Sequence, residues 1–183
     1  MIFYSKERKL SFVTIAKNGS ETVTKILKDD FKKVNTPQHT QIVIIRDPVS
    51  RWISGIVEQA LYGPHPRPQQ SIKSMLQSCK LKLQLQSISH VDFHTEPQVN
   101  FLDKLPTVYY YMTADVFERI NKDHNIFKNI EHHHNSETNQ QRREYTHALN
   151  EWVKANKDQV HAWLQEVYKD DYKLINNSKF VNR

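Results

Sequence analysis

The sequence predicts an α/β protein with a short central parallel sheet flanked by helices. The prediction rests on two observations of the same kind. An apolar, strand-like run leads directly into a helical pattern over residues 10–33, and the same succession recurs over residues 41–57. Successive strand-loop-helix units are typical of parallel strands joined by crossover helices. The 183 residues show no internal repeat and no shift in composition, so we expect one domain over residues 1–183.

The first unit begins with Leu10–Ala16, a short apolar run that suits a buried strand. Ile2–Tyr4 precedes it across the polar stretch SKERK, and the two segments are expected to pair as a hairpin. Ser20 is the expected N-cap of the helix that follows, which we predict to end near Lys33. Its apolar residues recur at helical spacing: Thr22, Val23, Ile26 and Leu27.

The second unit contains four consecutive apolar residues in QIVIIRDP, ended by Arg46. Such a run is typical of a central strand that is buried on both faces. Pro48 suits the first position of the next helix. That helix is expected to carry an apolar stripe made of Val49, Trp52, Ile53, Ile56 and Val57.

Further along the chain, Thr107–Met112 is predicted to be a third strand, with Tyr109–Tyr111 alternating between its two faces. Thr113 and Asp115 are suitable helix-start residues after it, and residues 144–175 are helical in character. The proline-rich stretch at residues 62–70 predicts an irregular loop, and residues 71–89 fit strand and helix equally well.

Composition limits the function classes. One cysteine, Cys79, excludes an internal disulfide and any multi-cysteine metal site, and the run of three histidines at residues 132–134 is expected to be a solvated loop, so no metal is predicted. Lys6 to Lys9 interrupt the N-terminal apolar stretch, and no run is long enough to span a bilayer. We therefore expect a soluble, cytoplasmic protein without a membrane partner, and the net charge of +6 favours an acidic ligand.

Basic residues follow both predicted strands. Lys17 and Gly19 lie at the first strand-helix junction, while Arg46, Arg51 and Ser54 lie at the second. Adjacent parallel strands bring their carboxyl ends to one edge of the sheet, so a ligand with two anionic groups would meet both junctions. Lys17 precedes Gly19 with no earlier glycine, which departs from the nucleoside triphosphate loop, and ATP or GTP hydrolysis is not expected.

These motifs resemble those of sulfotransferases that use 3′-phosphoadenosine 5′-phosphosulfate (PAPS). FVTIAKNGSETV, residues 12–23, is similar to their 5′-phosphosulfate loop, and IVIIRDPVSRWISG, residues 42–55, is similar to their 3′-phosphate signature. Weaker likenesses follow in order, since DFHTEPQVNFL resembles a His-x-x-Pro-Gln segment of carbohydrate (Golgi-type) sulfotransferases and VYKDDYKLI resembles their C-terminal ending. The resemblance spans residues 10 to 175 and implies a short, soluble version with a three-layer, P-loop-like fold.

The resemblance also implies the site. Lys17 would stabilise charge on the leaving-group oxygen, and adenosine 3′,5′-bisphosphate would be the product, with no metal required. Glu21 stands where the family usually has a small residue. The residues implied to bind the cofactor are Lys17, Asn18, Gly19, Ser20, Glu21, Thr22, Arg46, Ser54, Asn135 and Ser136.

Sulfuryl transfer needs a base that takes the acceptor's proton, and His94 is the first candidate, with His39 and Glu58 as alternatives. The expected acceptor is a hydroxyl or amine, most simply of a carbohydrate, and nucleic acid is not an expected partner. The alternative is a non-catalytic module whose basic cleft binds a nucleotide, nucleic acid or a sulfated polysaccharide. The sequence leaves the oligomeric state open.

Overall fold

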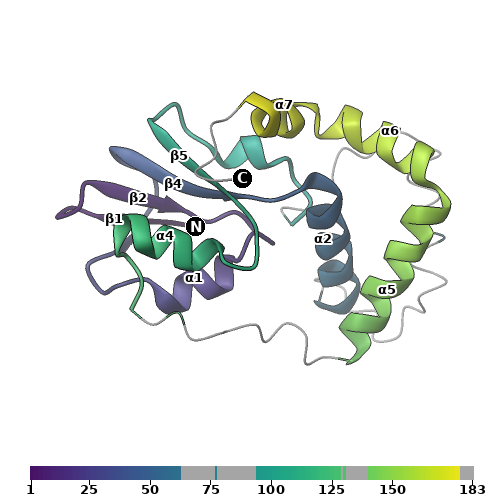
Figure 1. The fold of residues 1–183 in the computed structure, drawn as a ribbon, viewed down its shortest axis with the longest axis horizontal. Coiled ribbons are helices and arrows are strands. Elements are labelled where there is room, and N and C mark those ends of the chain that lie inside the picture. The colour runs from purple at the N-terminus through teal and green to yellow at the C-terminus, as the bar shows by residue number, and fades with distance from the viewer. Residues whose placement is uncertain (63–76, 78–93, 129, 131–139, 178–183) are drawn as a thin grey trace. The chain divides into compact units, whose positions relative to one another are not determined.

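The computed structural model describes residues 1–62, 77, 94–128, 130 and 140–177 (Figure 1). The chain divides into two compact units, and within the described residues it passes from one to the other after Asp47, Pro97 and Lys173. Unit 1 contains the N-terminal residues, the segment that begins at Gln98 and the segment that begins at Leu174. Unit 2 contains the segment from Pro48 to Pro97 and a later segment that ends at Lys173. A single domain over residues 1–183 stays a prediction.

Unit 1 is built on a mixed sheet with the strand order β3-β1-β2-β4-β5. Its strands are β1 (Ile2–Ser5), β2 (Leu10–Val13), β3 (Lys32–Val34), β4 (Thr40–Ile45) and β5 (Thr107–Tyr111). The predicted hairpin is confirmed by the antiparallel pairing of β1 with β2, and β3 also pairs antiparallel with β1. The predicted parallel sheet is confirmed for β2, β4 and β5, so only part of the whole sheet is parallel.

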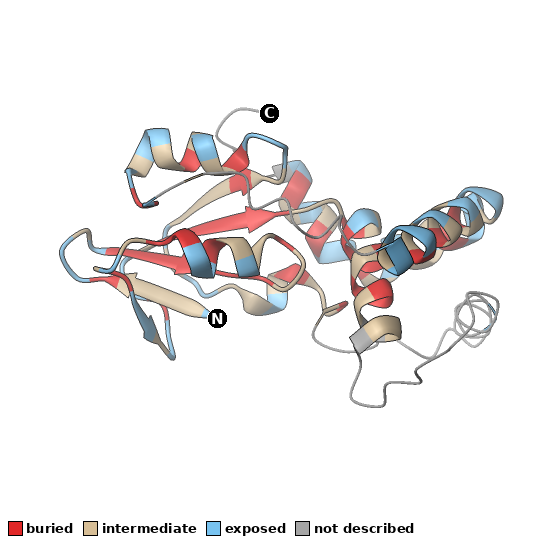
Figure 2. Cartoon of the chain, turned by 90° about the horizontal axis from the view of Figure 1, so that it is seen from below, coloured by how far each residue is buried: buried red, intermediate tan, exposed pale blue. Residues whose placement is uncertain are grey.

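Strand β4 is almost fully buried, and buried residues run along the sheet in Figure 2. Ile42 and Ile44 pack on one face, together with residues of α1 (Ser20–Ile26) and α4 (Val116–His124). Val43 and Ile45 pack on the other face. That face is covered by residues at the end of the short helix η1 (Gln98–Phe101) and in the second half of α7 (Lys169–Asn177): Phe101, Leu102, Leu174 and Ile175. Alternate residues of β4 therefore supply two cores.

The helix predicted to reach Lys33 is shorter than expected, because α1 ends at Ile26. Main-chain hydrogen bonds explain the early end: the Lys28 N–H donates to the Ile126 carbonyl, and the Lys128 N–H donates to the Ile26 carbonyl, each at 3.0 Å or less. The chain after α1 thus pairs with the segment after α4. It then enters β3, whose pairing with β1 overrides the helical pattern of the sequence.

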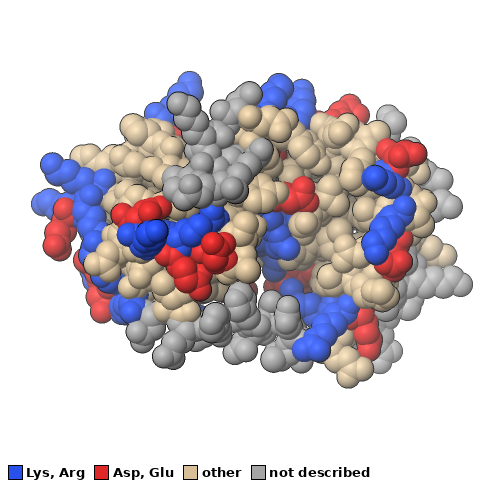
Figure 3. Space-filling model, viewed as in Figure 1, with Lys and Arg blue, Asp and Glu red and all other residues tan. Residues whose placement is uncertain are grey.

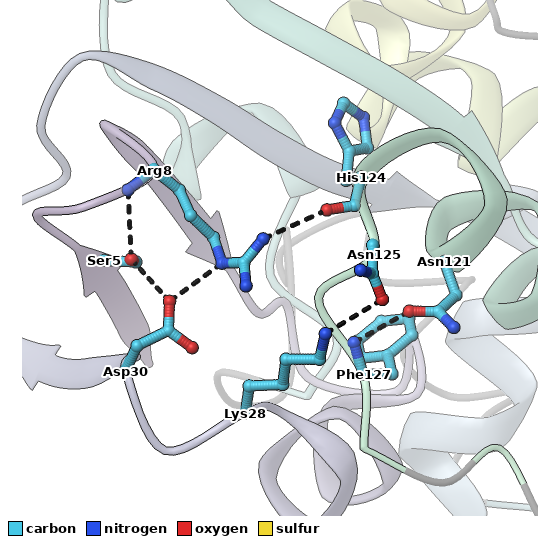
Figure 4. A network of polar contacts seen from close by, with 8 residues as sticks. All are labelled: Ser5, Arg8, Lys28, Asp30, Asn121, His124, Asn125 and Phe127. Atoms are coloured by element: carbon cyan, nitrogen blue, oxygen red, sulfur yellow. Dashed lines mark hydrogen bonds and ion pairs between the residues drawn. The ribbon is translucent and has the colours of Figure 1, made fainter.

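Figure 4 shows a polar network that joins the β1–β2 turn to the last turn of α4. The Arg8 Nε donates to Asp30 Oδ2 at 2.8 Å, and the Ser5 hydroxyl donates to the same oxygen at 2.7 Å. Arg8 also donates from Nη1 to the carbonyl of His124 at 3.4 Å. A cation shared between a carboxylate and a helix-terminal carbonyl stabilises both ends of this contact.

Unit 2 contains helices α2 (Pro48–Tyr62), α5 (Gln140–Ala155) and α6 (Lys157–Val167) and the first part of α7. The predicted apolar stripe of the second helix is confirmed, because its residues pack with those of α5 and α6 in one core: Trp52, Ile53, Ile56, Val57, Tyr145, Leu149, Val153, Val160 and Leu164. The predicted helical character of residues 144–175 is also confirmed. None of the described helices is both long and apolar enough to cross a bilayer.

The tyrosines of β5 alternate between the two faces of the strand, as predicted. Tyr110 is fully buried, and its hydroxyl donates to Asp123 Oδ2 at 2.7 Å and lies 2.9 Å from His124 Nε2. Tyr109 and Tyr111 pack on the opposite face. Burial raises the pKa of Tyr110 and lowers the pKa of His124, although the neighbouring Asp123 carboxylate partly opposes the second shift.

The lowered pKa of His124 predicts a loss of stability in acid. The unfolded chain binds a proton at His124 near its ordinary pKa of 6.5, whereas the folded protein binds it only at lower pH. The free energy of unfolding should therefore fall as the pH drops from about 7 to about 5. His124→Gln should reduce the dependence of this free energy on pH, measured by urea unfolding at several pH values. The variant keeps the groups around position 124, which are Tyr110, Asp123 and Arg8. An unchanged slope in the variant would contradict the assignment.

Candidate anion-binding site

The Lys17 loop, residues 14–19, joins β2 to α1. Lys17 and Gly19 have left-handed backbones, with φ of 67° and 77°, and Asn18 between them does not. Such alternation can turn main-chain N–H groups toward one side, an arrangement that binds anions in many proteins, although here the Asn18 N–H already donates to the Ile15 carbonyl at 3.1 Å. A lysine with positive φ also carries backbone strain of about 1 kcal/mol, and such strain concentrates at functional sites.

Gly19 is required by the fold itself. It takes the N-cap position of α1, so Ser20 is the first helical residue and not the predicted cap. A Cβ at Gly19 would lie 2.8 Å from Phe117 Cζ and 3.4 Å from Met112 Cε, in addition to the cost of its positive φ. The expected close approach of a cofactor to Gly19 stays a prediction. Glu21, in the first turn of α1, is exposed to solvent.

Arg46 lies at the same edge of the sheet as the Lys17 loop, because β2 and β4 are parallel neighbours. Its Nη1 donates to the carbonyl of Lys17 at 2.9 Å. Burial lowers the pKa of Arg46, while Asp47 and Tyr111 partly oppose the shift. A partly desolvated guanidinium beside the loop that carries Lys17 gives this edge of the sheet positive charge, which favours the binding of an anion.

A buried glutamine holds this arrangement together. Gln98 Oε1 accepts from the Arg46 main-chain N–H at 2.9 Å and from Asn18 Nδ2 at 2.7 Å. Its Nε2 donates to the Arg46 carbonyl at 2.9 Å. We call Asn18, Arg46 and Gln98 the amide clamp. The Pro-Gln segment of the sequence was used only to select His94, and Gln98 was not singled out. The one signal in the sequence was the position of Gln98 directly after the proline of that segment.

The role expected for Asn18 needs revision. Its main-chain N–H donates to the Ile15 carbonyl at 3.1 Å, and its Nδ2 donates to the Ile44 carbonyl at 2.7 Å as well as to Gln98. All three donors of Asn18 are thus engaged within the protein, and the residue is only 2% exposed. Asn18 therefore anchors the loop to β4, and a ligand would have to be held by its neighbours.

Unit 2 carries three of the predicted site residues: Ser54, Glu58 and His94. Ser54 and Glu58 lie on α2, and Glu58 is paired with Arg142 of α5. His94 begins the segment that leads to Pro97. Asn135 and Ser136, and most of residues 62–89, lie outside the described residues. The described part of the chain contains no group of three or more histidine, cysteine, aspartate or glutamate residues suited to a metal ion.

The segment that begins at His94 is closely held within unit 2. A Cβ at Gly55 of α2 would lie 2.6 Å from Thr95 Cγ2 and 2.8 Å from the His94 carbonyl oxygen. Only glycine lets the segment approach the helix this closely. The Tyr168 hydroxyl donates to the Thr95 carbonyl, and Arg51 Nη1 donates to the Glu96 carbonyl, from two side chains that are each 1% exposed.

Charges surround the buried Tyr168. Burial raises its pKa, the positive charge of Arg51 lowers it, and the negative charge of Asp171 raises it further. The net shift is upward, so the hydroxyl remains a donor to the Thr95 carbonyl at any physiological pH. Arg51, expected to lie near the ligand, instead supports the His94 segment in this structure.

His39 lies at the far end of β4 from Arg46, where it is exposed and stacks on Tyr4 with ring centroids 5.9 Å apart. The length of the strand separates His39 from Arg46 by roughly 20 Å. His39 is therefore poorly placed to act as a base beside Lys17.

Comparison of the chain with protein-family models, curated proteins and solved structures gives no match.

Gly55→Ala should destabilise the protein, although alanine is the better helix former by about 1 kcal/mol. The new methyl group would overlap Thr95 and the His94 carbonyl, and overpacking of this kind costs about 1–3 kcal/mol. We expect a net loss in the free energy of unfolding, measured by urea denaturation.

The double variant Gly55→Ala/Thr95→Ser is the matched control, because it removes the Cγ2 atom that lies 2.6 Å from the new methyl group. It should recover part of the loss. A single variant more stable than the wild type would show that helix propensity outweighs the contact, and would refute the close approach of the His94 segment.

Proposed function

We propose that the chain is a PAPS-dependent sulfotransferase with a P-loop-like α/β fold. The observation that carries the proposal is the contact between Arg46 and the Lys17 loop at the carboxyl edge of two parallel strands. Two cationic residues meet there within one unit, in the order and on the elements that the resemblance requires. A ligand with phosphates at both ends of a nucleoside would suit them.

The proposed reaction moves a sulfuryl group from PAPS to a hydroxyl or amine of an acceptor, most simply a carbohydrate. The acceptor atom attacks sulfur as the bond from sulfur to the 5′-phosphate oxygen breaks, and the electron pair remains on that oxygen. The Lys17 ammonium would neutralise this charge as it develops, and Arg46 would bind the 3′-phosphate. Ser54, on α2 of unit 2, stays a predicted contact of that phosphate from the resemblance alone. No metal is required for this step.

The acceptor's proton must pass to a base, and we keep His94 as the first of the three candidates. Glu58 is already engaged in an ion pair with Arg142, and His39 lies at the opposite edge of the sheet. His94 begins a segment that is held by Gly55 and Tyr168, which would limit its movement. A base held in one position contributes through both proton transfer and orientation.

The rival function is a non-catalytic module that binds polyanions. Figure 3 weighs against one version of it, because basic and acidic side chains are intermixed among the described residues on the face of unit 1 in view, which carries α1 and α4. Long polyanions bind best to continuous basic surfaces, with steep loss in salt. A short bisphosphate needs only the local site at Lys17 and Arg46.

Adenosine 3′,5′-bisphosphate should raise the melting temperature of the wild-type protein by roughly 5–10 °C at about one hundred times its Kd. AMP and ATP should have smaller effects. Arg46→Ala should lose most of this shift, because it removes the guanidinium but keeps the main-chain groups that Gln98 holds. A thermal-shift titration measures all three ligands on both proteins.

Arg8→Ala is the matched control, since Arg8 is another partly buried arginine of unit 1 but pairs with Asp30. It should lower the melting temperature and keep the ligand-induced shift. Equal responses to ATP and to the bisphosphate, or a full response in Arg46→Ala, would refute the proposed cofactor class.

A further inference from the structure

We infer that Gln98 is a positioning residue that couples Arg46 to the Lys17 loop, so that the two bind one ligand as a unit. Its role toward a ligand rests on the proposed function, whereas the contacts themselves do not. One side-chain amide makes three hydrogen bonds of 2.7 to 2.9 Å, two with the main chain of Arg46 and one with Asn18. All three distances are within the normal range for hydrogen bonds, the contact with Asn18 is buried, and Gln98 itself is 0% exposed.

The clamp replaces a missing strand. The last paired residues of β2 and β4 are Val13 and Val43, but β4 continues to Ile45. Toward β5, the Ile45 carbonyl accepts from the Met112 N–H at 2.8 Å. Main-chain groups alternate in direction along a strand, so those of Ile44 and Arg46 face the side that β2 has left.

Buried main-chain groups need partners, and two side chains supply them. Asn18 donates to the Ile44 carbonyl, and Gln98 binds both the N–H and the carbonyl of Arg46. The two amides also bind each other, at 2.7 Å. The pairing that a neighbouring strand would have given β4 is thus made by the loop that carries Lys17 and by the residue after Pro97.

Only a primary amide suits this position. The Arg46 N–H and Asn18 Nδ2 both require an acceptor, while the Arg46 carbonyl requires a donor. Glutamate offers acceptors but no donor when ionised, and leucine offers neither. The same pattern orients Asn18, whose Nδ2 faces two acceptors, Gln98 Oε1 and the Ile44 carbonyl. A change at Gln98 therefore disturbs the loop and Arg46 together.

The test compares Gln98→Leu with Gln41→Leu. Gln41 is a second glutamine that is 0% exposed on the same sheet, and its Nε2 donates to the Asp103 carbonyl at 2.8 Å. It lies at the opposite end of β4, so its loss costs a buried amide without touching the clamp. Gln98→Glu, which is nearly isosteric, serves as a second variant should Gln98→Leu fail to fold.

Two quantities are measured for each protein: the hydrogen exchange rate of the Arg46 amide without ligand, and the Kd for adenosine 3′,5′-bisphosphate. We expect the Gln98 variants to exchange at least tenfold faster at Arg46 and to bind at least tenfold more weakly. Gln41→Leu should change neither by more than about twofold, because a general loss of stability would not act selectively on this edge.

Unchanged exchange at Arg46 in the Gln98 variants would overturn the clamp. Faster exchange with unchanged Kd would overturn its role in positioning. A wild-type protein that does not bind the bisphosphate would overturn the proposed function and with it the ligand role of Gln98, and the exchange rate would still decide whether Gln98 holds Arg46.

Discussion

Strand β2 leaves the sheet before its parallel neighbour β4 ends, and the geometry of the candidate site depends on this difference. The departure leaves main-chain groups of Ile44 and Arg46 without a strand beside them. Because such groups are costly to bury unpaired, the chain brings two amide side chains to them. The Lys17 loop is held to β4 by the first, and Arg46 is held by the second, so the main chain of Lys17 and the guanidinium of Arg46 meet as a consequence of satisfying the backbone.

The five residues from His94 to Gln98 have structural roles in both units. Within unit 2, Thr95 and Glu96 are held through their carbonyls by buried donors, and Gly55 leaves space for them. Within unit 1, Gln98 completes the amide clamp. The contacts of Thr95 and Glu96 use main-chain carbonyls, so they depend on Tyr168 and Arg51 as donors, whereas the contacts of Gln98 depend on its own side chain.

The sequence allowed the main elements to be predicted, because their signals are local. The apolar run of β4 and the helical spacing of α2 depend only on residues a few positions apart. The positions of Lys17 and Arg46 after two parallel strands followed from the same reasoning. Strand β3 was not predicted, because its sequence of two lysines and a valine has no apolar alternation. This segment is a strand because it pairs with β1.

Gln98 was unpredictable for a different reason. Its partners lie 52 and 80 residues away in the sequence, and two of its three bonds go to main-chain groups, which carry no sequence signal. Gly19 and Gly55 were visible as rare glycines, yet the contacts that require them, with Phe117 and with the His94 segment, come from distant parts of the chain.

The most direct test of the account is a titration of isotopically labelled protein with adenosine 3′,5′-bisphosphate, followed by the amide chemical shifts of each residue. The account predicts that the amides of Gly19, Ser20 and Arg46 shift together and saturate with one Kd, while those of Thr40 and Thr107 at the opposite edge of the sheet do not. Saturable shifts confined to other residues, or none at the Lys17 loop, would contradict it.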